Sequence, residues 1–144
     1  MIEQDTIRLL RECDAGIQMG VSSIDDVVDH VHSRGLKKYL SDCREQHSRL
    51  KEEIDTMLHG FQDGGKAPNP LTRGMAHVRT NARILMDSSD AAIADIITDG
   101  CNMGVKSLNR YLNQCKAADE RSKDITKRLI NLEEKLTEEI RHFL

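Results

Sequence analysis

The chain has 144 residues, of which 38% are hydrophobic and 31% charged, and its formal net charge at pH 7 is −3. This length suits one domain, and an aromatic content of 3% argues against an all-β sandwich or barrel. A sequence pI near 6.1 gives no basic surface for nucleic acid. The sequence has neither an apolar run of about 20 residues nor the pattern of a signal peptide. We therefore expect a cytoplasmic all-α protein with no nucleic-acid or membrane partner.

Two long segments in the first sixty residues repeat apolar side chains at helical spacing. The first runs from Ile7 to Val31 and the second from Leu36 to Phe61, with a short break at residues 33–35 between them. Glycines and prolines between residues 60 and 70 end the second segment. Because the break is short, residues 1–60 are predicted to form an antiparallel helical hairpin.

A crossover at residues 61–89 follows this hairpin and contains a shorter amphipathic stretch. Its apolar face carries Leu71, Met75, Val78, Ala82 and Leu85, and its other face carries three arginines. We interpret this stretch as a short helix that runs back along the bundle. Residues 88–90 (Ser-Ser-Asp) supply N-cap chemistry for the next helix. Two further apolar stripes, at 91–115 and 125–143, predict a second hairpin over residues 90–144.

An internal repeat relates the two predicted hairpins. Residues 16–24 align with residues 100–108, so that Met19-Gly20 matches Met103-Gly104. Residues 50–54 resemble residues 136–140, with a shift of two positions. The repeat favours one pseudo-twofold, antiparallel four-helix bundle spanning residues 1–144, in which the two matched glycines lie at one level.

Three short motifs resemble a bacterial ferritin-like four-helix-bundle family of unknown function. Residues 11–16 (Arg-Glu-Cys-Asp-Ala-Gly) are similar to a Cys-Lys-Asp-Gly-type stretch that opens the family's first helix. Gly100-Cys101 corresponds to a Gly-Glu-type pair in its third helix, and residues 64–68 are similar to its Gly-rich, Pro-containing loop. The resemblance implies a ferritin-like fold made of two hairpins joined by a long crossover, and it brings no assigned reaction.

The wider ferritin-like group suggests where iron ligands would lie. Its iron-binding members place a Glu on each of two helices and Glu-x-x-His on the other two. Counting from the turns, the corresponding layer here holds Ile17, Leu50, Cys101 and Leu136, which offer one thiol and no carboxylate. We therefore predict no di-iron centre, no cofactor and no enzymatic activity.

A few polar residues on or beside the apolar stripes are weaker candidates for metal ligands. Cys43 and His47 are one helical turn apart, but counting levels places His47 opposite Gly20 and Gly104, which favours a packed structural histidine. Asp14 needs either a hydrogen bond or an open bundle end. Surface carboxylates and packed side chains are the preferred interpretation of the whole set of candidates: Asp14, Cys43, His47, Glu53, Asp99, Cys101, Glu139 and His142.

The sequence thus favours a non-enzymatic ferritin-like structural or interaction protein, expected to form a homodimer through the crossover region or a bundle face. Two alternatives stay open. One is a metal-binding or redox-active ferritin-like protein with a degenerate carboxylate/Cys/His site. The other is a regulatory module that binds a small ligand in a core containing its four cysteines, which are Cys13, Cys43, Cys101 and Cys115.

Overall fold

The computed structural model describes the backbone of residues 1–144 and every side chain except that of Leu71. Its helices are α1 (Ile2–Val27), α2 (Arg34–His59), α3 (Pro70–Met86), α4 (Asp90–Gln114) and α5 (Glu120–Ile140), with 3-10 turns at Val28–His30 and Arg141–Phe143. No strand occurs in the described backbone, which confirms the prediction of an all-α protein. Within that description, none of the helices is both long enough and apolar enough to cross a membrane.

Three of the helices begin at side-chain caps. The side-chain oxygens of Ser33, Ser89 and Asp119 accept backbone hydrogen bonds from the first turns of α2, α4 and α5. Each cap satisfies one N–H group that has no partner within its helix, and a cap of this kind contributes about 1 kcal/mol. The cap predicted at residues 88–90 is therefore supplied by Ser89.

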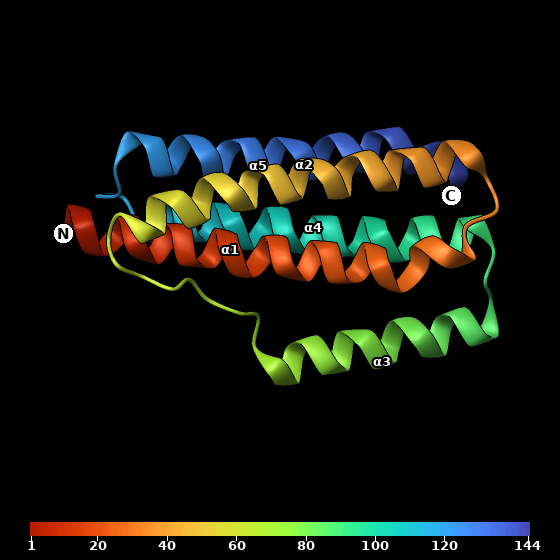
Figure 1. The fold of residues 1–144 in the computed structure, drawn as a ribbon. Coiled ribbons are helices and arrows are strands. Elements are labelled where there is room, and N and C mark those ends of the chain that lie inside the picture. The colour runs from red at the N-terminus through yellow and green to blue at the C-terminus, as the bar shows by residue number, and fades with distance from the viewer.

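Four helices pack side by side, and the fifth lies outside them (Figure 1). Helices α1 and α2 form one antiparallel hairpin, and α4 and α5 form the other. Helix α1 also packs on α4, and α2 on α5. Because the crossover returns along the bundle, α2 and α4 run in the same direction (Figure 1). Helix α3 contacts α1 and α4 from outside.

The inner faces of α1, α2, α4 and α5 form one apolar core. The four residues that the sequence placed in one layer, Ile17, Leu50, Cys101 and Leu136, are all buried members of it. A smaller cluster at the N-terminal end of α1 contains Leu9, Cys115 and Ala118. The four cysteines are buried free thiols, as the sequence predicts.

Aspartate side chains join the two hairpins at both ends of the bundle. At one end, the Asp90 carboxylate accepts hydrogen bonds from the backbone N–H groups of His32 and Ser33, at 2.8 and 2.9 Å. At the other end, the Ala117 N–H donates to Asp5 Oδ2 at 3.0 Å. The turn of each hairpin is therefore hydrogen-bonded to the first helix of the other hairpin, which begins beside it.

The crossover is anchored to the bundle at Asp14, which is 2% exposed. Its carboxylate accepts a 2.9 Å hydrogen bond from Lys51 Nζ and a 3.0 Å hydrogen bond from the backbone N–H of Lys66. Gly65 has a φ of 84°, and a Cβ atom there would overlap the Asp14 carboxylate. Asp14 is thus satisfied by hydrogen bonds, and only a glycine fits where the crossover passes it.

Helix α3 turns its apolar face away from its own bundle. Met75, Val78, Leu85 and Met86 are 65–89% exposed, whereas Ile84 is buried against the bundle. Polar contacts complete the attachment, because Arg83 pairs with Asp95, and His77 Nδ1 lies 3.0 Å from Asp26 Oδ2. Ala82 of the predicted stripe is also exposed, and the side chain of Leu71 lies outside the described part of the chain.

Candidate functional site

A polar layer crosses the centre of the apolar core. It consists of His47 from α2 and Glu133 from α5, which are 2% and 6% exposed. His47 Nε2 lies 3.7 Å from Glu133 Oε1, a distance that makes an ion-pair contact. Among the described residues, His47 Nε2 and Glu133 Oε2 have no hydrogen-bond partner. The two side chains therefore depend on each other for electrostatic compensation inside the bundle.

Two glycines make room for this pair. A Cβ atom at Gly20 of α1 would lie 3.2 Å from His47 Nε2, and a Cβ atom at Gly104 of α4 would overlap the Glu133 carboxylate. Each large polar side chain therefore packs against a glycine of its own hairpin. Because the four residues form one continuous set of contacts, Gly20 and Gly104 lie in the same layer, as the repeat predicts.

The other ring nitrogen of His47 faces its own helix. The Nδ1–H group donates to the Cys43 carbonyl oxygen at 2.8 Å, and the Cys43 thiol sulfur lies 3.4 Å from the same nitrogen. This contact fixes the ring and directs Nε2 toward Glu133. Cys43, His47 and Glu133 thus form a consecutive thiol–imidazole–carboxylate series.

The surroundings shift the protonation equilibria of this series. Burial lowers the pKa of His47, but its contacts with Cys43 and Glu133 outweigh that effect and raise the pKa to about 10. Burial raises the pKa of Glu133, and the neighbouring His47 offsets only part of the increase. The raised pKa therefore favours the imidazolium form of His47, which lies beside the Glu133 side chain.

The remaining thiols have different surroundings. Cys13 Sγ lies 3.2 Å from Thr126 Oγ1, and burial raises the pKa of Cys13 to about 12. Burial also raises the pKa values of Cys101 and Cys115, and the negative charge of Glu133 adds to the increase at Cys101. Among the described residues, Cys43 is the one thiol with an imidazole nitrogen within hydrogen-bond distance.

The predicted metal candidates are dispersed. Glu53 accepts two 2.9 Å hydrogen bonds from Arg128, Asp99 is exposed, and exposed His142 contacts the rings of Tyr39 and Phe143. Glu139 is partly buried on the last turn of α5. No group of three or more His, Cys, Asp or Glu side chains in the described part of the chain is placed to hold a metal ion. Of the eight candidates, the layer brings together Cys43 and His47, with Cys101 in the core nearby.

Glu133 is the residue that the sequence analysis missed. It follows Leu132 and precedes Leu136 on the apolar stripe of α5, where a carboxylate reads as a flanking residue. The repeat contained the signal, however. The shift that aligns residues 50–54 with residues 136–140 also aligns His47 with Glu133.

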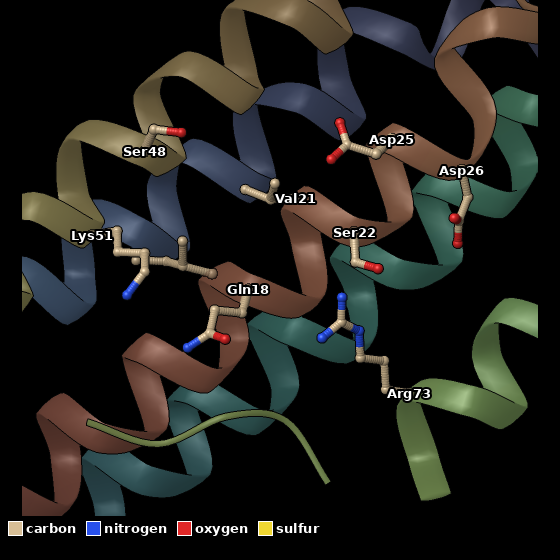
Figure 2. A pocket seen from close by; sticks show the side chains of 9 residues that line it. Gln18, Val21, Ser22, Asp25, Asp26, Ser48, Lys51 and Arg73 are labelled. Atoms are coloured by element: carbon tan, nitrogen blue, oxygen red, sulfur yellow. The ribbon is translucent and has the colours of Figure 1, made fainter. Parts of the chain in front are cut away.

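A surface groove of about 450 Å³ lies between α1, α2 and the first turn of α3, and Arg73 reaches into it from α3 (Figure 2). Its other charged groups are already paired. Asp25 binds Arg44 through two hydrogen bonds, and Asp26 contacts His77. Lys51 on the far wall is held by Asp14 and Asp55. Because these charged groups are paired, the groove is a weaker candidate for a functional site than the central layer.

Comparisons with models of protein families, with curated proteins and with solved structures give no match to this chain.

Proposed function

We propose that this chain is a non-enzymatic ferritin-like interaction protein that forms a homodimer through the outer face of α3. The outward apolar face of that helix carries the proposal. Val78 and Leu85 are two turns apart on one side of the helix, and both project into solvent. A helix of 17 residues is about 26 Å long, so its exposed stripe is long enough to form the centre of a modest interface.

Charge complementarity favours a second copy as the occupant of this face. The chain has 24 acidic and 21 basic side chains, and α3 contains three of the arginines and no acidic residue. The rest of the chain therefore has 24 acidic and 18 basic side chains. If the two α3 stripes cover each other, the exposed Arg79 approaches the more acidic bundle of the other copy, while Arg73 and Arg83 stay against their own bundle.

The solution mass tests this proposal. Light scattering of the untagged protein at micromolar concentration is expected to give twice 16.3 kDa. Val78→Glu should dissociate the dimer, because it places a carboxylate in the proposed interface. Met103→Glu on α4 is the matched control, since the two side chains are 67% and 66% exposed. A wild-type monomer, or equal dissociation by both variants, would contradict the proposal.

The metal content of the purified protein tests the proposal that the chain is not an iron enzyme. The layer of Ile17, Leu50, Cys101 and Leu136 supplies one thiol and no oxygen ligand, whereas a di-iron centre needs carboxylates and imidazoles converging on one layer. We expect protein grown in iron-rich medium to contain no stoichiometric iron. Two irons per chain within the bundle would instead support the metal-binding alternative.

A further inference from the structure

We infer that Cys43 is a peroxide-oxidised thiol, activated by His47 and Glu133, and that it is converted to a sulfenic acid ahead of the other three cysteines. This role lies beyond the interaction function proposed above and does not depend on it. The supporting geometry is the series from Cys43 Sγ to His47 Nδ1, at 3.4 Å, and from His47 Nε2 to Glu133 Oε1, at 3.7 Å.

Such a series has the parts that an activated sulfur needs: a nucleophile, an imidazolium beside it, and a carboxylate that orients and charges the ring. The Cys43 carbonyl and the Gly20 surface hold the His47 ring in place, and the Gly104 surface holds the Glu133 carboxylate. An imidazolium beside sulfur stabilises the negative charge that develops when the thiol loses its proton. Among the described residues, the other three thiols have no imidazole nitrogen within hydrogen-bond distance, and burial raises their pKa values.

The oxidation step balances with hydrogen peroxide as the oxidant. The His47 imidazolium has a hydrogen on both ring nitrogens, so it stabilises negative charge on the Cys43 sulfur and does not accept the thiol proton. The sulfur attacks one peroxide oxygen, so that an S–O bond forms as the O–O bond breaks. Sulfur loses two electrons, the peroxide is reduced, and the departing hydroxide takes up the thiol proton and leaves as water.

Burial alone predicts a different order of reaction. Cys101 is 8% exposed and Cys43 only 3%, while Cys13 and Cys115 are 0% exposed. If access controlled oxidation, Cys101 would react first. If the imidazolium controls it, Cys43 reacts first in spite of its lower exposure. The four thiols of one folded chain therefore serve as controls for one another.

The test treats folded wild-type protein with hydrogen peroxide in the presence of dimedone. The remaining thiols are then alkylated after denaturation, and each cysteine is quantified by peptide mass spectrometry. We expect Cys43 to lose its free thiol about tenfold faster than Cys101, because the imidazolium beside Cys43 stabilises its thiolate, and to carry the dimedone adduct. Earlier loss of Cys101, or equal rates at both, would overturn the inference.

The Glu133→Gln variant distinguishes activation of the Cys43 thiol from a general loosening of the fold. The measured quantity is the ratio of Cys43 to Cys101 oxidation rates, in which any general increase in access cancels. The variant removes the charge that supports the imidazolium at Cys43 and also removes a charge that disfavours the Cys101 thiolate. The ratio should therefore fall, and an unchanged or higher ratio would overturn the inference. Glu53→Gln is the control, because Glu53 joins α2 to Arg128 of α5 at the surface.

Discussion

The two hairpins differ most at their matched central positions. Each has a Met-Gly pair on its first helix and a large polar side chain on its second, packed against that glycine. In the α1–α2 hairpin the polar side chain is His47, and in the α4–α5 hairpin it is Glu133. One backbone plan thus carries opposite charges in its two copies. A hairpin can pair with its counterpart through this contact, whereas two identical hairpins would bring like charges together.

A rise in pH is expected to have the largest effect on this pair of opposite charges. The pKa of His47 rises from 6.5 to about 10 on folding, so its contribution is fully present below pH 6.5 and is lost as the pH rises through 10. The loss amounts to roughly 5 kcal/mol, at about 1.4 kcal/mol per pKa unit. The raised pKa of Glu133 acts in the same direction at lower pH.

This expectation is measured by urea unfolding between pH 6 and 10, comparing wild type with His47→Leu/Glu133→Leu. The apolar pair does not titrate, so the difference in unfolding free energy isolates the layer. Parallel pH profiles for the two proteins would show that the pair does not bind protons more tightly in the folded state.

Exchanging the charges sharpens the comparison between the hairpins. Glu133→His or His47→Glu alone places two like groups in the layer, and each should cost about 3–5 kcal/mol, the cost of breaking a buried ion pair. The reciprocal double variant restores opposite charges next to the two glycines. Chemical denaturation should recover most of the lost stability in that variant. If the two single losses simply add, the hairpins are not equivalent around this layer.

Asp14 and Thr98 align under the same shift that matches residues 16–24 with residues 100–108, and substitutions there should show a smaller difference in stability between the two hairpins. Asp14→Asn weakens the contacts with Lys51 and with the crossover, so we expect a loss of about 2 kcal/mol. Thr98→Val removes a buried hydroxyl that has no hydrogen-bond partner among the described residues, and it should be neutral or slightly stabilising. Thermal melts of both variants at neutral pH provide the measurement. A larger loss of stability for Thr98→Val than for Asp14→Asn would contradict the conclusion that Asp14 makes the stabilising contacts.

The glycines should show the smallest difference. Gly104→Ala places a methyl group in the space of the Glu133 carboxylate, and we expect it to cost about 1–2 kcal/mol. Gly20→Ala meets His47 at 3.2 Å, and the higher helix propensity of alanine, about 1 kcal/mol, should offset most of the strain. Equal stability of the two variants by urea unfolding would mean that Glu133 moves without cost.

Periodicity predicted the helical class and the burial of Ile17, Leu50, Cys101 and Leu136, because buried helix faces impose a spacing that the sequence displays. Counting levels from the turns likewise placed His47 opposite Gly20. Periodicity did not reveal Glu133, since one carboxylate within an apolar stripe has no local pattern that distinguishes burial from exposure. The Lys66 contact with Asp14 depends on the path of an irregular segment, which periodicity does not encode.

Helix α3 shows a second limit of pattern reading. An amphipathic helix normally turns its apolar side to the core of its own chain. Here the bundle-facing side of α3 is attached through Ile84, Arg83 and His77, and the apolar stripe faces outward. The sequence defines the stripe, but which side meets the bundle depends on contacts between distant residues.

The crossover is a single covalent connection between two hairpins that already recognise each other. The aspartate contacts at both ends and the central ion pair all join one hairpin to the other without passing through α3. A chain cleaved between α3 and α4 would therefore yield two different fragments that reassemble with each other in preference to their own copies. The fold is in this sense equivalent to a heterodimer of two hairpins that are joined covalently. The two halves, expressed as separate chains, should reconstitute it.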